Sequence, residues 1–279
     1  MSDDSHARLD APPVPQWLRL LGEAAAMLRF YSRLPLPALG PFDDPAAPPP
    51  FARACRMLPV ASLVIAAPQA LVVAVLGLTA LPALFVATMS VAAGLIATGA
   101  LHEDGLADMA DGFGGGATVA RKLEIMKDSR VGSYGVAALA LALLARTALV
   151  AALLLHGPLV AATSLLGAGI LSRGLSLALF AALPAARPDG VASAVGRPEP
   201  AAVTIACLLT LGLVGLAALP WLTEGLAVLR LLTGLLVAAA VTLAVSRLAL
   251  RQIGGQTGDV LGAAQVLAEI GFLAGLLAI

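Results

Sequence analysis

The chain has 279 residues, of which 59% are hydrophobic and only 12% charged, with a mean hydropathy of +0.94. Because a soluble domain carries about 25% charged residues, this composition excludes an ordinary soluble enzyme, a disordered chain and a basic nucleic-acid-binding protein. The 17 basic residues equal the 17 acidic ones, so net charge indicates no partner. Cys55 and Cys207 are too few for a disulfide framework and lack metal-ligand spacing. The remaining class is a polytopic membrane protein.

Residues 1–53 precede the first long apolar run and are expected to form a cytoplasmic N-terminal segment. Residues 1–9 have no apolar core, so no cleavable signal peptide is expected. Residues 16–34 mix three arginines with aromatic and aliphatic side chains. This mixture predicts an amphipathic helix lying on the membrane interface. The seven prolines of residues 35–50 predict a loop.

Residues 54–279 are expected to form a single transmembrane catalytic domain. A membrane-spanning helix needs about 20 mostly apolar residues. Such runs predict about seven spans, at residues 57–77, 81–101, 132–155, 158–182, 201–220, 226–246 and 260–279. The predicted fold is therefore an all-α polytopic integral membrane protein, with cytoplasmic amphipathic helices in addition to the spans.

The basic residues predict the orientation of these spans. Fourteen of the 17 lie before the first span or in the connections after the second, fourth and sixth spans. The opposite connections, around residues 78–80, 156–157 and 221–225, contain no Lys or Arg. The positive-inside rule therefore places the N-terminus in the cytoplasm and the C-terminus outside.

Four charged residues fall inside the predicted spans. A charge there costs several kcal/mol unless it is paired or hydrated. Arg173 and Glu269 are candidates for a buried ion pair or for lining a polar cavity, Arg146 has no assigned partner, and Arg230 is close enough to its helix end to reach water.

An acidic loop at residues 102–130 carries the strongest signal of chemistry. It contains six of the 17 acidic residues, and Asp104, Asp108 and Asp111 are spaced at i, i+4 and i+7. On a helix continuing out of the second span, these three lie within about 60° of one another. Carboxylates so arranged repel one another unless a cation intervenes. They suit Mg²⁺, which binds proteins through a few carboxylates together with substrate phosphates.

Glycines 112 and 114–116 are expected to end that helix, and a second helix is predicted over about residues 117–130. It presents basic side chains that can contact phosphate oxygens: Arg121, Lys122, Lys127 and Arg130. A metal beside these bases would hold a pyrophosphate for phosphoryl transfer. The alternative, that the run is a solvated cytoplasmic loop, stays open at this point.

At these residues the sequence resembles a known family. ALHEDGLADMADGFGGG, followed by RKLEIMKDSRVGSYGVAAL, resembles the signature of the adenosylcobinamide-GDP ribazoletransferases, which are cobalamin synthases of the bacterial inner membrane. Further matching stretches are FYSRLPLP at residues 30–37, SRG at 172–174, LPAARPDG at 183–190 and GGQTGDVLGAA at 254–264.

The resemblance implies a multi-pass enzyme with its active site at the cytoplasmic face. It implies the joining of adenosylcobinamide-GDP to α-ribazole or its 5′-phosphate, which gives adenosylcobalamin or its phosphate and releases GMP, with Mg²⁺ required. The lipid bilayer is an implied partner, and a second copy of the chain or other corrinoid-assembly enzymes are compatible ones.

The resemblance also implies roles for individual residues. Asp104, Asp108 and Asp111 are the implied catalytic residues and metal ligands, with Asp108 or Asp111 as the expected acceptor of the hydroxyl proton. Asp259 is equally a helix N-cap candidate, and the glycines around it favour an anion-binding turn. In LPAARPDG, Ala185 and Ala186 stand where the family leads us to expect the aromatic-containing PYARPDG, while Arg187 and Asp189 are present. The implied substrate-binding residues are Glu103, Arg121, Lys127, Asp128, Ser129, Arg130, Arg187, Thr257 and Asp259.

Two rival functions are compared with this one. A CDP-alcohol phosphatidyltransferase also places aspartates at the end of a membrane helix, but it requires DG-x-x-A-R, whereas this chain has Asp108 and no arginine there. A transporter is disfavoured because the hydrophilic motifs gather in loops and no repeat relates the two halves of the chain.

Overall fold

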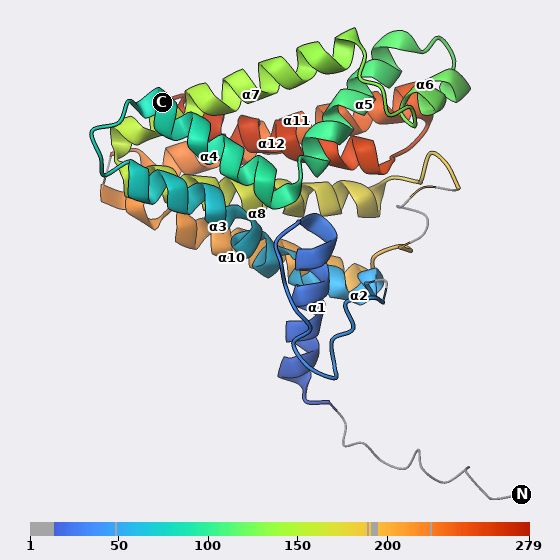
Figure 1. Ribbon diagram of the computed structural model, residues 1–279, viewed down its shortest axis with the longest axis horizontal. Coiled ribbons are helices and arrows are strands. Elements are labelled where there is room, and N and C mark those ends of the chain that lie inside the picture. The colour runs from blue at the N-terminus through green and yellow to red at the C-terminus, as the bar shows by residue number, and fades with distance from the viewer. Residues whose placement is uncertain (1–13, 48, 189, 191–194, 224) are drawn as a thin grey trace, which may run out of the picture.

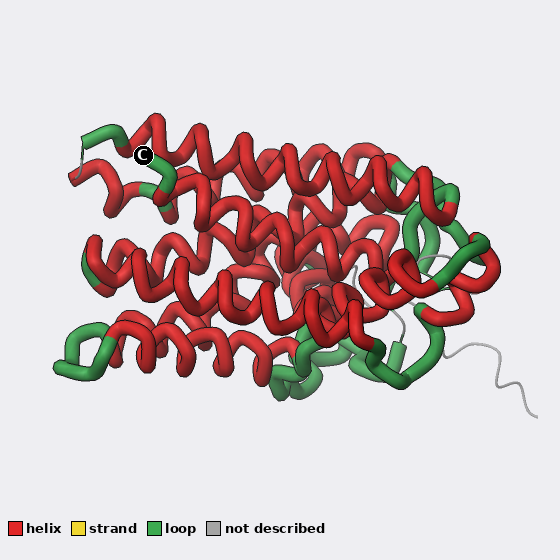
Figure 2. Tube along the Cα trace, turned by 90° about the horizontal axis from the view of Figure 1, so that it is seen from above, coloured by secondary structure: helices red, strands yellow, loops and turns green. Residues whose placement is uncertain are grey.

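The computed structural model describes residues 14–47, 49–188, 190, 195–223 and 225–279. Arg8 and Asp189 lie outside these residues. Within the described part of the chain the regular structure is helical, apart from one isolated bridge between Ala185 and Gln256. The long helices run side by side as one bundle (Figures 1 and 2).

Six of these helices are long and apolar enough to cross a membrane. A seventh crossing is α4 (Ala83–Thr98), when it is taken together with the short α5 (Leu101–Gly115) that follows it. The all-α polytopic fold with about seven spans is thereby confirmed. The six helices are α3 (Leu58–Leu76), α7 (Ser133–Leu153), α8 (Pro158–Ala182), α10 (Pro200–Ala217), α11 (Ala227–Ile253) and α12 (Gly258–Leu277).

Two helices form the centre of the bundle. In α8 and α12, 72% of the most apolar stretch is buried, against 22% in α7, α10 and α11. Small residues allow the close approach that membrane helices need. A side chain at Gly275 of α12 would lie 2.6 Å from the Cα of Gly234 on α11, so the two backbones touch there. The outer helices leave many leucines exposed, whereas α12 packs against α5, α7, α8 and α11.

A sharp break separates α4 from α5. Gly99 and Ala100 both have left-handed backbones, with φ of 64° and 56°, and the two helices meet at 89°. The prediction that the second span continues straight into the acidic helix is therefore wrong. Arg33 packs into the break, because its backbone N–H donates to the carbonyl of Ala97 at 2.8 Å and its side chain covers Gly99.

The acidic loop also differs from its predicted outline. α5 continues through Gly112 and Gly114 and ends at Gly115, so the glycines lie in its last turn and not beyond it. The second helix, α6 (Val119–Ile125), is shorter than predicted, and Thr118 caps it by accepting a hydrogen bond from the Arg121 N–H.

The N-terminal helix α1 (Gln16–Tyr31) lies across the direction of the bundle (Figure 1). It is followed by a proline-rich loop and by the short helices α2 (Phe51–Ala54) and η1 (Cys55–Met57). The Arg29 guanidinium holds the loop against α1 through both oxygens of Asp43, each at 2.7 Å. Trp17 remains 65% exposed, and the interfacial position of α1 stays a prediction.

The connections divide between the two ends of the bundle (Figure 1). α5, α6, the chain between α8 and α10, and the turn between α11 and α12 lie at one end, called here the polar end. The connections between α3 and α4, α7 and α8, and α10 and α11 lie at the other end with the C-terminus. Arg230 is near that second end, where it donates to the carbonyl of Leu276 and stacks over Trp221.

Candidate active site

Two chain segments far apart in sequence meet at the polar end, namely α5 and the start of α12. A side chain at Gly105 would lie 2.9 Å from the carbonyl oxygen of Asp259 and 3.0 Å from its Cα. Only a glycine at this position permits such a backbone contact. The glycine that follows Asp104 therefore brings the acidic face of α5 against Asp259.

Arg187 joins this group from the chain that follows α8. Two backbone hydrogen bonds fasten that chain to the turn before α12: Ala186 N–H to Gln256 O at 2.9 Å, and Gln256 N–H to Pro184 O at 2.8 Å. From there an Nη of Arg187 lies 3.6 Å from Oδ2 of Asp259. Arg187 therefore lies beside the carboxylates, and its role in substrate binding stays a prediction.

Thr257, and not Asp259, is the N-cap of α12. Its hydroxyl accepts a hydrogen bond from the Val260 N–H at 3.3 Å and donates one to Oδ2 of Asp259 at 3.1 Å. A threonine is a favoured N-cap because its oxygen satisfies a free N–H of the first turn. The Asp259 carboxylate is therefore not needed for capping and faces Arg187.

Asp108 lies at the centre of this charge group. It is half-buried and experiences the negative charges of Asp104, Asp259 and Asp111, with Arg187 as the opposing cation. Negative charge is therefore in excess around Asp108. Such an excess favours binding of a cation.

The carboxylates at the polar end fit a Mg²⁺ ion that is bound partly by the protein and partly by the substrate. Across the described part of the chain, no three His, Cys, Asp or Glu side chains converge closely enough to hold an ion by themselves. Mg²⁺, however, commonly binds through one or two carboxylates and takes its other ligands from substrate phosphates and water. Asp104, which is exposed, and Asp108 provide such a pair of carboxylates.

Asp111 has a different environment from the other two aspartates of α5. It is buried, and its two oxygens accept hydrogen bonds from the N–H groups of Gly132 at 2.7 Å and Gly135 at 2.9 Å, at the start of α7. A carboxylate suits this helix N-terminus because free N–H groups point toward it. The geometry makes Asp111 a residue that joins α5 to α7, and it does not support the predicted role as a metal ligand.

The predicted phosphate-contacting residues around α6 lie in exposed positions at the polar end. Arg121 pairs with Glu124 at 2.8 Å, and Arg130 pairs with Asp128 at 2.6 Å. Hydrogen bonds from Arg130 lower the pKa of Asp128 to about 2. Lys127 and Ser129 lie in the same exposed loop. Two of these cations, Arg121 and Arg130, are therefore already paired with acidic residues of the same loop.

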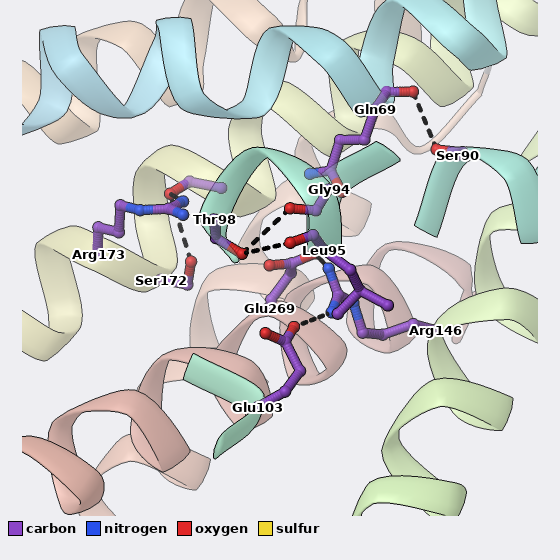
Figure 3. A network of polar contacts seen from close by, with 11 residues as sticks. Gln69, Ser90, Gly94, Leu95, Thr98, Glu103, Arg146, Ser172, Arg173 and Glu269 are labelled. Carbon is purple, nitrogen blue, oxygen red and sulfur yellow. Dashed lines mark hydrogen bonds and ion pairs between the residues drawn. The ribbon is translucent and has the colours of Figure 1, made fainter. Parts of the chain in front are cut away.

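Glu103 is buried in the interior of the bundle and points toward Arg146 (Figure 3). There Arg146 of α7 lies 2.5 Å from Glu103 and 3.0 Å from Glu269 of α12. Glu269 thus pairs with Arg146 and not with Arg173, which donates to the carbonyl of Gly169 at 3.0 Å. Arg173 and Glu269 do line the same small polar cavity, which was the other predicted arrangement. The predicted substrate contact of Glu103 has no support from this placement.

A cavity of about 340 Å³ adjoins the aspartates. Asp104 and Asp259 line it together with His102, and the ring of Tyr31 from α1 lies parallel to the His102 ring at a centroid distance of 6.2 Å. Sequence reasoning passed over both rings, because a lone histidine is more often structural and nothing in the pattern connects residue 31 to residue 102.

Comparison with known proteins identifies the family. The family model described as cobalamin-5-phosphate synthase matches residues 23–277, which is most of the chain. The chain belongs to this family.

Relatives of the cobalamin-5-phosphate synthase family cover nearly the whole chain. The protein named adenosylcobinamide-GDP ribazoletransferase in Azorhizobium caulinodans is 45% identical to this chain, over 93% of this chain and 96% of the relative. The protein of the same name in Xanthobacter autotrophicus is 43% identical, over 93% of this chain and 97% of the relative. The protein of that name in Sinorhizobium medicae is 40% identical over 91% and 95%. No solved structure matches the chain significantly. These names agree with the resemblance in the sequence and do not favour a phosphatidyltransferase or a transporter.

Proposed function

We propose that this chain joins adenosylcobinamide-GDP to α-ribazole or its 5′-phosphate, giving adenosylcobalamin or its phosphate and GMP. The observation that carries the proposal is the meeting of Asp104, Asp108, Asp259 and Arg187 beside a cavity at the polar end. Membership of the family, and relatives named for this transfer, supply the substrates.

The transfer replaces one bond to phosphorus by another. The 5′-hydroxyl oxygen of α-ribazole forms a bond to the phosphorus that carries the cobinamide group. The bond from that phosphorus to the bridging oxygen of the pyrophosphate breaks, and GMP leaves with this oxygen. Both oxygens of Asp111 already accept hydrogen bonds, so Asp108 or Asp259 is the better placed acceptor of the hydroxyl proton.

Asp104 and Asp108 would hold Mg²⁺ together with the pyrophosphate oxygens of the substrate. Bound there, Mg²⁺ supplies positive charge that offsets the charge of the pyrophosphate and of the departing GMP. Arg187 adds a positive group on the side of α12. Arg121, Lys127 and Arg130 remain proposed contacts of the outer phosphate, since they lie in the exposed loop that borders α5.

We place the protein in a bacterial inner membrane with the polar end in the cytoplasm. The distribution of Lys and Arg supports this orientation, and so does the position of α1 across the bundle, where an interfacial helix is expected (Figure 1). The soluble nucleotide substrate would then reach the aspartates without crossing the bilayer.

The test uses the full chain purified in lipid nanodiscs. With adenosylcobinamide-GDP, α-ribazole and Mg²⁺, chromatography is expected to show one GMP for each adenosylcobalamin formed. EDTA should stop both products. Formation of neither product in the complete mixture contradicts the proposed transfer, whereas an unchanged rate in EDTA contradicts only the role of Mg²⁺. Omission of α-ribazole is the control for simple hydrolysis.

A further inference from the structure

The cavity beside Asp104 has an aromatic wall built from three elements. Phe30 and Tyr31 come from the end of α1, Phe51 from α2 and Phe180 from α8, and all four line the cavity. Phe51 lies between two of the other rings, with centroid distances of 5.6 Å to Phe30 and 5.5 Å to Phe180. These mutual ring contacts hold the wall in place before any ligand binds.

The size of the cavity restricts what it can hold. At about 340 Å³ it is at the small end of ligand pockets, which measure about 300–1,000 Å³. A nucleoside has about 20 non-hydrogen atoms and fits such a space. A corrin ring with its side chains is several times larger, and must therefore stay outside.

The polar side chains that line the cavity are Asp104, Asp259, His102, Tyr31, Ser176 and Gln265. Asp104 and Asp259 are the carboxylates of the reaction site, so a ligand in the cavity reaches the transferred phosphorus from this side. His102 is only 5% exposed, and its Nε2 has no hydrogen-bond partner among the described residues. This atom is itself buried, so His102 contributes its ring to the lining of the cavity and Nε2 is not in reach of a ligand there.

We infer that this aromatic cavity binds the nucleoside acceptor, with its flat benzimidazole base against Phe30, Tyr31, Phe51 and Phe180 and its ribose toward Asp104 and Asp259. The inference rests on the proposed function and specifies where one of the two substrates binds. A dimethylbenzimidazole base presents mostly carbon and suits a carbon-lined wall. Guanine, the other base in the reaction, carries several donors and acceptors on its edges, for which this wall offers few partners.

The experiment measures KM for α-ribazole and KM for adenosylcobinamide-GDP separately. Phe30→Leu combined with Tyr31→Leu keeps most of the apolar volume and removes the two cavity rings that are partly exposed. Because stacking of a base on an aromatic ring is worth a factor of ten or more, this variant should raise KM for α-ribazole by about tenfold. KM for adenosylcobinamide-GDP should stay unchanged. Phe85→Leu is the matched control, since Phe85 is 46% exposed on α4 and does not line the cavity.

A binding measurement on the unaltered protein covers the case in which the variant fails to fold. Calorimetry in nanodiscs should show α-ribazole displaced by free 5,6-dimethylbenzimidazole and not by GMP. The inference is overturned if the variant raises only KM for adenosylcobinamide-GDP, raises both Michaelis constants equally or changes neither. It is also overturned if GMP displaces α-ribazole. In all of these cases the unaltered protein still forms adenosylcobalamin, whereas a failure of the proposed function leaves it inactive.

Discussion

Glu103 and Asp104 are neighbours in sequence but have opposite environments. Successive residues of a helix point about 100° apart, so Glu103 enters the buried network with Arg146 while Asp104 lines the cavity. The ion pair inside the bundle therefore anchors the first turn of α5. It holds in place the turn that carries one of the two proposed metal ligands.

The three aspartates of α5 should respond differently to substitution. Asp104→Asn and Asp108→Asn each remove a proposed ligand of the metal and should lower kcat by about a hundredfold or more. Their thermal unfolding in nanodiscs should be unchanged. Asp111→Asn keeps one acceptor oxygen but leaves one buried N–H of α7 without a partner, so it should lower stability by about 1–3 kcal/mol.

Calorimetry and the GMP assay on the three variants together distinguish these roles. Full activity of both Asp104→Asn and Asp108→Asn contradicts the proposed site. An unchanged melting temperature of Asp111→Asn contradicts the assignment of Asp111 to holding α7.

Sequence reasoning singled out the carboxylates of the candidate site but not their partners. Asp104 and Asp108 stand out because helical spacing and low overall charge make an acidic face conspicuous. The pairing of Arg187 with Asp259, and of Arg146 with Glu269, joins residues that are 72 and 123 positions apart. Such pairs depend on how the helices pack, which cannot be predicted from a local sequence pattern.

At the scale of elements, hydropathy predicted the spans well and their internal breaks poorly. The fourth predicted span, residues 158–182, has the bounds of α8, because it is a continuous apolar run between Gly157 and a proline-containing loop. The break after α4 was missed because Ala100, with φ of 56°, has no sequence signature of a left-handed residue. Tertiary packing of α5 against α12 compensates for the strain.

The contact between α5 and α12 should be sensitive to one methyl group. Gly105→Ala places a Cβ 2.9 Å from the carbonyl oxygen of Asp259, so the two backbones must move apart. Because small displacements of reacting groups have large effects on rate, kcat should fall by about tenfold or more, with most protein still folded. Gly212→Ala on α10 is the control, since open space surrounds Gly212. Equal activity of the two variants would show that the contact does not position the site.

At the scale of the whole molecule, an equal number of acids and bases conceals a separation of charge along the bundle. The loops rich in Lys and Arg gather at the polar end, and the connections at the other end lack them (Figure 1). The net charge of zero therefore describes a molecule with one strongly polar end, where the aspartates also lie.

The opposite placement of the two ends can be measured by labelling. In a chain with both native cysteines replaced by alanine, Gly115→Cys and Thr223→Cys introduce exposed thiols at the polar end and at the other end. A membrane-impermeant maleimide added to intact cells should label position 223 and leave position 115 unlabelled until the cells are opened. Labelling of both positions from the same side is incompatible with seven spans.

The order of the buried charges along the chain has a consequence for synthesis. An arginine entering the bilayer costs about 2.5–3.5 kcal/mol when it is unpaired. Glu103 precedes Arg146, so the carboxylate is already present when the ribosome delivers α7 to the translocon. Arg173 follows with α8 and leaves an excess of positive charge. Glu269, on the last helix, restores neutrality. A chain truncated before α12 therefore retains an uncompensated arginine within the membrane.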